Sequence, residues 1–160
     1  MKDFLNNIKT CVIGSLDSSG HPFSSYAPYN YDGCNFYIYI SDIATHAKNI
    51  QQNAKTSLFF IEDEEKTENL FARKRISLQC DASMISRESE KFETIMQEFA
   101  QKFDSKMVEM LKGMMDFNLY IFTVNSGEAT FGFGEAYNIG GDNMNELVAR
   151  KGGGHGHRKS

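Results

Sequence analysis

"TCVIGSLDSSGHPFSSYAPYNYDGCNFYIYIS", residues 10–41, is the stretch that decides the fold of this chain. It holds three runs rich in β-branched and aromatic residues, and turn-forming residues at 17–22 and 32–33 separate them. Such runs with short turns between them are typical of strands joined by hairpins. The stretch therefore predicts three strands in an antiparallel meander.

The third run has the clearest strand period. Apolar residues occupy the even positions from Phe36 to Ile40, and hydroxyl-bearing residues occupy the odd positions from Tyr37 to Ser41. Successive side chains of a strand point to opposite faces of the sheet. We therefore expect a half-buried strand with one apolar face and one polar face.

Strand and helix patterns alternate along the rest of the chain. A hairpin turn is expected at "NSGEA", residues 125–129. An amphipathic helix with a break near 103–106 is expected over residues 87–113, and a short helix capped by Ser41 or Asp42 is expected over residues 41–55. The remaining expected elements are strands at 56–63, at 72–86 and within 116–139, with an acidic loop at 62–69.

The apolar positions of both helices are expected to pack against the sheet. This set comprises Ile43, Ala47, Ile50, Phe92, Ile95, Met96, Phe99, Phe103, Met107, Met110 and Leu111. Many short strands with few helices and no βαβ alternation favour a closed or partly closed antiparallel barrel. We expect a mainly β (α+β) fold, with one domain over residues 1–150 and two or three flanking helices.

Composition excludes several classes of function. The chain has 160 residues, 41% of them hydrophobic, and a net charge of -4, so nothing resembles the basic surface of a nucleic-acid-binding protein. No signal-peptide core and no long uncharged apolar run is present, which predicts no export, no membrane span and a cytoplasmic location. Cys11, Cys34 and Cys80 are an odd count without paired spacing, as expected for free thiols in a reducing compartment.

The last ten residues, 151–160, read as a flexible glycine-histidine tail with His155 and His157. Such a tail is either a frayed terminus or a segment that folds over a metal centre. A zinc site would need three or four ligands, whereas haem iron needs a single protein histidine, held by a carboxylate nearby.

Basic residues at Arg73 to Arg75 open a strand, where they form either a solvated strand end or a clamp for FMN phosphate or haem propionates. "GFGEAY", residues 132–137, is no dinucleotide fingerprint, because it lies in a strand pattern and no helix follows it. His46 reads as a packing or capping residue, and His21 as an exposed turn residue.

Four segments resemble the HugZ/HutZ haem-utilisation family of the pyridoxamine-phosphate-oxidase-like, FMN-binding split-barrel superfamily. They are "TCVIGSLDSSGHPFSSYAPY"; "SDIATHAKNI" with "ARKRISLQCDA"; "MMDFNLYIF"; and "FGFGEAYNIGGD" with the glycine-histidine tail. The resemblance implies a split β-barrel homodimer with two ligand sites in the subunit interface. The superfamily often binds FMN there, whereas this branch binds haem through a histidine of the C-terminal loop.

Carried over by position, the resemblance makes His155 the iron ligand, with His157 as the alternative, and places Arg75 beside the haem. Asp116 would hydrogen-bond the proximal histidine across the dimer. Thr10 matches a position on the distal side of the haem, and His46 matches a histidine of a helix. Arg73 and Lys48 are further candidates for cofactor binding. Only nine residues precede Thr10, so a leading element that covers the pocket is expected to be missing.

The function that follows is haem degradation for iron acquisition, in which O2 and an external electron donor open the porphyrin. Two alternatives stay open. One is a haem carrier or store that performs no turnover. The other is an FMN-dependent oxidoreductase, although Lys48 alone is a poor basic set for a flavin phosphate.

Overall fold

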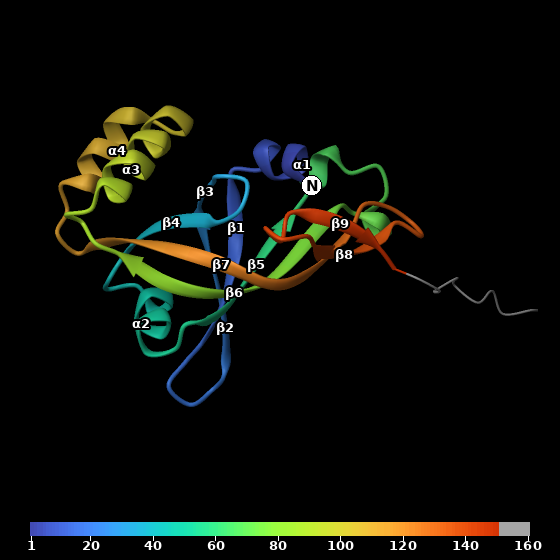
Figure 1. Ribbon diagram of the computed structural model, residues 1–160, viewed down its shortest axis with the longest axis horizontal. Coiled ribbons are helices and arrows are strands. Elements are labelled where there is room, and N and C mark those ends of the chain that lie inside the picture. Colours follow the sequence, from blue (N-terminus) through green and yellow to red (C-terminus); the bar gives the residue numbers. More distant parts are fainter. Residues whose placement is uncertain (151–160) are drawn as a thin grey trace, which may run out of the picture.

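A computed structural model describes residues 1–150 and is shown in Figure 1. It confirms a mainly β fold, an antiparallel split barrel with flanking helices. The helices are α1 (Lys2–Asn7), α2 (Thr45–Gln52), α3 (Glu90–Lys102) and α4 (Ser105–Lys112), with short 3-10 turns η1 (Glu64–Lys66) and η2 (Leu70–Ala72). The strands are β1 (Thr10–Leu16), β2 (Pro22–Pro28), β3 (Asn30–Tyr31), β4 (Phe36–Ser41), β5 (Lys55–Ile61), β6 (Arg75–Ile85), β7 (Phe117–Thr130), β8 (Ala136–Gly140) and β9 (Glu146–Ala149).

The curled sheet has the strand order β2-β1-β5-β6-β7-β4-β3, and β8 and β9 extend from one end of β7. The expected meander is confirmed in part: β1 pairs with β2, and the end of the second run, β3, pairs with β4, but the other side of β4 pairs with β7. Pro22 and Pro28 bound the edge strand β2, where a residue without an N–H donor is tolerated and discourages pairing with other chains.

The expected turn at residues 125–129 is wrong, because β7 runs straight through this segment. Asn125 is instead the extra residue of a β-bulge, since Gln79 pairs with Ser126 while Cys80 pairs with Val124. Gly127 serves close packing: a Cβ atom there would lie 2.5 Å from Leu78 Cδ2. The chain reverses after Thr130 instead, in the glycine-rich turn at 131–135.

Two apolar clusters stabilise the fold, one inside the barrel and one under α3 and α4. Tyr37 is fully buried in the second cluster, so β4 is covered on both faces and not half-buried as expected. The helix break is confirmed, because Asp104 caps α4 by accepting a hydrogen bond from Met107 N at 3.0 Å. Met107 and Met110 are exposed, so the apolar stripe expected along 87–113 is buried mainly in α3.

Helix α2 begins later than expected. Ala44 is its N-cap residue, without a side-chain hydrogen bond, and Ile43 lies outside the helix with 77% of its surface exposed. Cys11 and Cys80 are buried free thiols, and burial raises the pKa of Cys80 to about 12. Within residues 1–150, no helix is both long and apolar enough to cross a membrane.

Candidate functional site

Thr10 and Arg75 lie on the outer face of the sheet, away from the barrel core. Val12 lies opposite Phe59, and the same register continued along β1 sets Thr10 level with Ile61, which lies opposite Arg75. The positions of Thr10 and Arg75 are therefore two strand spacings apart, which is about 10 Å. The register therefore brings together two residues that are 65 positions apart in the sequence.

A cavity of 1020 Å³ opens beside this row. Thr10 and Arg73 both line it, and so does Phe4 of α1, whose ring meets the Phe131 ring edge-on with centroids 5.4 Å apart. The expectation that a leading element is missing is thus wrong: α1 is anchored by the buried Leu5 and supplies one cavity wall.

Charged side chains of both signs line this cavity. The cationic ones are Lys9, Lys66, Arg73 and Lys74, and the acidic ones are Glu62, Asp63 and Glu135. The Arg73 guanidinium is fixed by a hydrogen bond from Nε to the Glu62 carbonyl at 2.7 Å, and Arg75 donates to the Arg73 carbonyl at 2.8 Å. Apolar aromatic walls with several cations suit a flat apolar ligand that carries carboxylates or phosphates.

Asp116 lies far from Arg75 within one chain. Arg75 pairs with Thr130 at one end of the β6–β7 ladder, and Ile85 pairs with Leu119 at the other end, where Asp116 lies just before β7. Ten residues of strand separate the two ends, which is about 34 Å of extended chain. Figure 1 shows α3 and α4 near the Asp116 end, and β8 and β9 at the Arg75 end.

His46 and Lys48 belong to α2 and lie apart from Thr10. The His46 Nδ1 atom is 2.7 Å from the Ser25 hydroxyl, and Ser25 pairs with the buried Ile13, so His46 contacts the inner side of β2. Burial holds the pKa of His46 below its usual value. Lys48 is exposed on the surface of α2.

The tail residues His155 and His157 lie outside the described part of the chain. That part ends at Arg150, which binds Glu128 at 2.5 Å and Asn138 at 3.0 Å. Among residues 1–150, no group of three or more histidine, cysteine, aspartate or glutamate side chains is placed to hold a metal ion.

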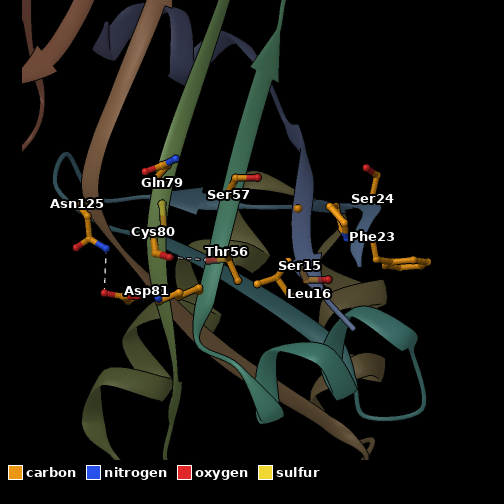
Figure 2. Close-up of a pocket in the computed structure, with 13 residues that line it drawn as sticks. Ser15, Leu16, Phe23, Ser24, Thr56, Ser57, Gln79, Cys80, Asp81 and Asn125 are labelled. Atoms are coloured by element: carbon orange, nitrogen blue, oxygen red, sulfur yellow. Dashed lines mark hydrogen bonds between the residues drawn. The ribbon is translucent and has the colours of Figure 1, made fainter. Parts of the chain in front are cut away.

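A second hollow of 600 Å³ lies further along the same outer face and is shown in Figure 2. A row of small and polar residues crosses it, from Ser24 through Gly14 and Ser57 to Gln79. At Gly14 the two strands approach closely, because a Cβ atom there would meet the Ser57 hydroxyl. Of the expected site residues that lie within 1–150, none lines this hollow.

Sequence reasoning missed several residues of the larger cavity, above all Phe4, Lys66 and Phe131. Phe4 lies in a short N-terminal segment whose pattern is too brief to place it. Phe131 is the first residue of the glycine-rich turn, which the sequence pattern predicts as part of a strand. Its two positive-φ glycines, Gly132 and Gly134, were the available signal for a turn.

Comparisons with known proteins identify the family of this chain. Residues 1–131 match the family described as pyridoxamine 5'-phosphate oxidase. The chain is 34% identical over 159 residues to the heme oxygenase HutZ of Vibrio cholerae serotype O1, which covers 99% of this chain and 88% of that protein.

Similar solved structures include those of HutZ and ChuZ. One, described as HutZ, the heme storage protein from Vibrio cholerae, has a TM-score of 0.73 at 33% identity and covers 78% of this chain and 87% of that chain. Campylobacter jejuni ChuZ has a TM-score of 0.87 at 28% identity, and the match covers 99% of this chain but 64% of that one. The chain therefore belongs to the pyridoxamine 5'-phosphate oxidase family and, within it, to the HugZ/HutZ group.

Proposed function

We propose that this protein binds haem as its substrate and opens the porphyrin ring, releasing iron in the cytoplasm. The observation that carries the proposal is the 1020 Å³ cavity with aromatic walls and cationic side chains, next to the outer-face row of Thr10 and Arg75. The similarity to HutZ, which is named a heme oxygenase, supports it.

The cavity residues suit haem better than a small polar ligand. Phe4 and Phe131 offer apolar surface to the macrocycle, and Lys66 and Arg73 offer cations to the two propionates. Arg75 opens β6 directly beside this cavity. Haem, O2 and electrons from an external donor supply the ring-opening chemistry, while the protein supplies ligation, orientation and a shaped pocket.

His155 is the proposed iron ligand, and chain length allows it to act at the Arg75 end of its own subunit. Ala149 pairs with Tyr137, Tyr137 with Ala129, and Ala129 with Ile76, the neighbour of Arg75. Three strand spacings amount to about 14 Å. The five residues from Arg150 to His155 span up to about 17 Å when extended, which is enough.

Asp116 is the proposed hydrogen-bond partner of that histidine, and it has to come from a second copy of the chain. The reach of the tail from Arg150 is about half of the 34 Å of strand that separates Arg75 from the Asp116 end. A homodimer in which the Asp116 end of one subunit lies at the Arg75 end of the other removes this difficulty. A carboxylate bonded to the histidine increases electron donation to iron, which favours oxygen activation.

Exposed apolar residues at both ends support this pairing. Met115 at the Asp116 end is 79% exposed, and Phe71 and Phe133 near the cavity are 91% and 68% exposed. Exposed large apolar side chains that gather in one place mark interaction surfaces. The proposed homodimer would bring both sets toward its interface.

A haem carrier or store is the second candidate, because the HutZ crystal structure is described as that of a heme storage protein. Its binding residues would be the same, and turnover separates the two functions. An FMN-dependent oxidoreductase remains consistent with the match to pyridoxamine 5'-phosphate oxidase, and bound flavin would identify it.

The test is an absorption titration of the purified protein with haemin, before and after addition of ascorbate and O2. We expect a Soret band that His155→Ala strongly weakens and that His21→Ala, a change at an exposed turn residue, leaves unchanged. Loss of the band with release of iron supports degradation, whereas a stable band supports the carrier. A protein that is isolated yellow with flavin and binds haemin no better in the wild type than in His155→Ala would overturn the proposal.

A further inference from the structure

Asp116 is held in place by the loop between β4 and α2. The Ser41 hydroxyl lies 2.8 Å from Asp116 Oδ2, and the backbone N–H of Asp42 donates to the Asp116 carbonyl at 2.6 Å. Ser41 also pairs with Phe117, the residue that follows Asp116. Both the side chain and the main chain of this aspartate are thus tied to one short segment.

That segment is itself rigidly braced. The Asp42 carboxylate accepts two hydrogen bonds from Asn118, at 2.8 and 2.9 Å, and one from Gln51 at 3.0 Å. Gln51 also donates to the Tyr120 hydroxyl at 3.0 Å. The loop is therefore bonded to β7 on one side and to α2 on the other, and Ser41 has little freedom to move away from Asp116.

The hydrogen bonds around Ser41 also fix where its proton points. The backbone N–H of Ile43 approaches the Ser41 oxygen at 3.4 Å as a donor. A carboxylate can only accept, so the hydroxyl proton is directed at Asp116 Oδ2. Within residues 1–150, every hydrogen bond to the Asp116 side chain falls on Oδ2, which leaves Oδ1 to receive a further donor.

We propose that Ser41 is a positioning residue, which orients the Asp116 carboxylate so that Oδ1 faces the haem-ligating histidine of the other subunit. This inference rests on the proposed function, in which Asp116 bonds that histidine. It adds a residue of β4 that acts through Asp116 and does not itself touch haem.

Two effects of removing the hydroxyl oppose each other. Losing a donor makes a carboxylate a stronger acceptor, whereas losing its anchor lets it rotate away from its target. Asp116 is exposed, so water replaces the missing donor. Orientation then decides the outcome, and Ser41→Ala is expected to weaken the bond from the histidine to Asp116.

The experiment measures the iron–histidine stretching frequency of the ferrous haem complex by resonance Raman spectroscopy, because this frequency rises when the histidine is hydrogen-bonded to a carboxylate. The variants are Asp116→Asn, Ser41→Ala, Ser41→Thr and the double variant. Ser126→Ala is the matched control, since its hydroxyl donates to Gln79 at 3.2 Å and lies elsewhere on β7.

We expect Asp116→Asn to lower the frequency, Ser41→Ala to lower it part of the way, and Ser41→Thr and Ser126→Ala to keep the wild-type value. Ser41→Ala should have no further effect in the Asp116→Asn background. If Asp116→Asn lowers the frequency but Ser41→Ala does not, the role of Ser41 is refuted and the proposed function stands. If Asp116→Asn leaves it unchanged, the proposed roles of Asp116 and Ser41 are both refuted.

Discussion

Arg87 is predicted to hold the segment that carries Asp116, and its removal gives a large and measurable loss of stability. Its Nη2 atom donates to the carbonyls of Met114 and Phe117 at 2.6 and 2.7 Å, and Nη1 donates to the Lys112 carbonyl at 3.1 Å. Lys112 is the last residue of α4 and the other two carbonyls follow the helix, on either side of Asp116. The positive charge also lies where a helix C-terminus favours it.

The expected cost follows from these contacts. A hydrogen bond to a charged group contributes about 1.5 kcal/mol at the lower end of its range, so three contribute about 4.5 kcal/mol before correction. The segment is partly exposed and water restores some of this, while the guanidinium also lies 5.4 Å from the Phe92 ring centroid. We expect Arg87→Ala to lower the free energy of unfolding by about 3 kcal/mol.

Urea unfolding followed by circular dichroism measures this loss, since the chain has no tryptophan. Arg87→Lys should recover only part of it, because one ammonium cannot reach three divergent carbonyls. Arg150→Ala is the control, as its ion pair with Glu128 is exposed and worth less than about 1 kcal/mol. A loss for Arg87→Ala no larger than that of Arg150→Ala would refute the reasoning.

Two further predictions concern stability. Gly127→Ala should lower the free energy of unfolding in urea by about 1 to 3 kcal/mol, because its Cβ would lie 2.5 Å from Leu78 Cδ2 and 2.8 Å from the Ser77 carbonyl oxygen. Gly113→Ala is the control and should lower it less, because the nearest atom to its Cβ is 3.4 Å away. Equal losses for the two variants would contradict the packing argument. His46 has a lowered pKa in the fold, so its contribution to folding stability is present above the unfolded pKa of about 6.5 and is lost as pH falls below that value. His46→Gln should therefore reduce the fall in urea midpoint between about pH 7.5 and 5.5. A fall as steep as that of the wild type would count against this role of His46.

Local signals predicted several elements correctly. The break between α3 and α4 follows from Asp104, which acts as an N-cap over a few residues and needs no distant partner. The prediction of a turn at residues 125–129 is wrong. Glycine is common in turns, but Gly127 serves close packing against Leu78 and Ile139. Tertiary contacts decided its role, and the sequence pattern does not contain them.

The candidate site was predictable only in part. Resemblance pointed to Thr10 and Arg75, but their placement on one row depends on the register between β1, β5 and β6. Register is set by long-range pairing, which local periodicity does not reveal. The separation of Asp116 from Arg75, on which the proposed second subunit rests, also follows from the length of β6 and β7.

The central claim is that each haem site combines His155 of one subunit with Asp116 of the other. Heterodimers that carry His155→Ala in one subunit and Asp116→Asn in the other, isolated with two different affinity tags, test it directly through their rate of haem loss with ascorbate. Such a dimer holds one intact site, so we predict about half of the wild-type rate per dimer. A rate no higher than the mean of the two parental homodimers would contradict the account.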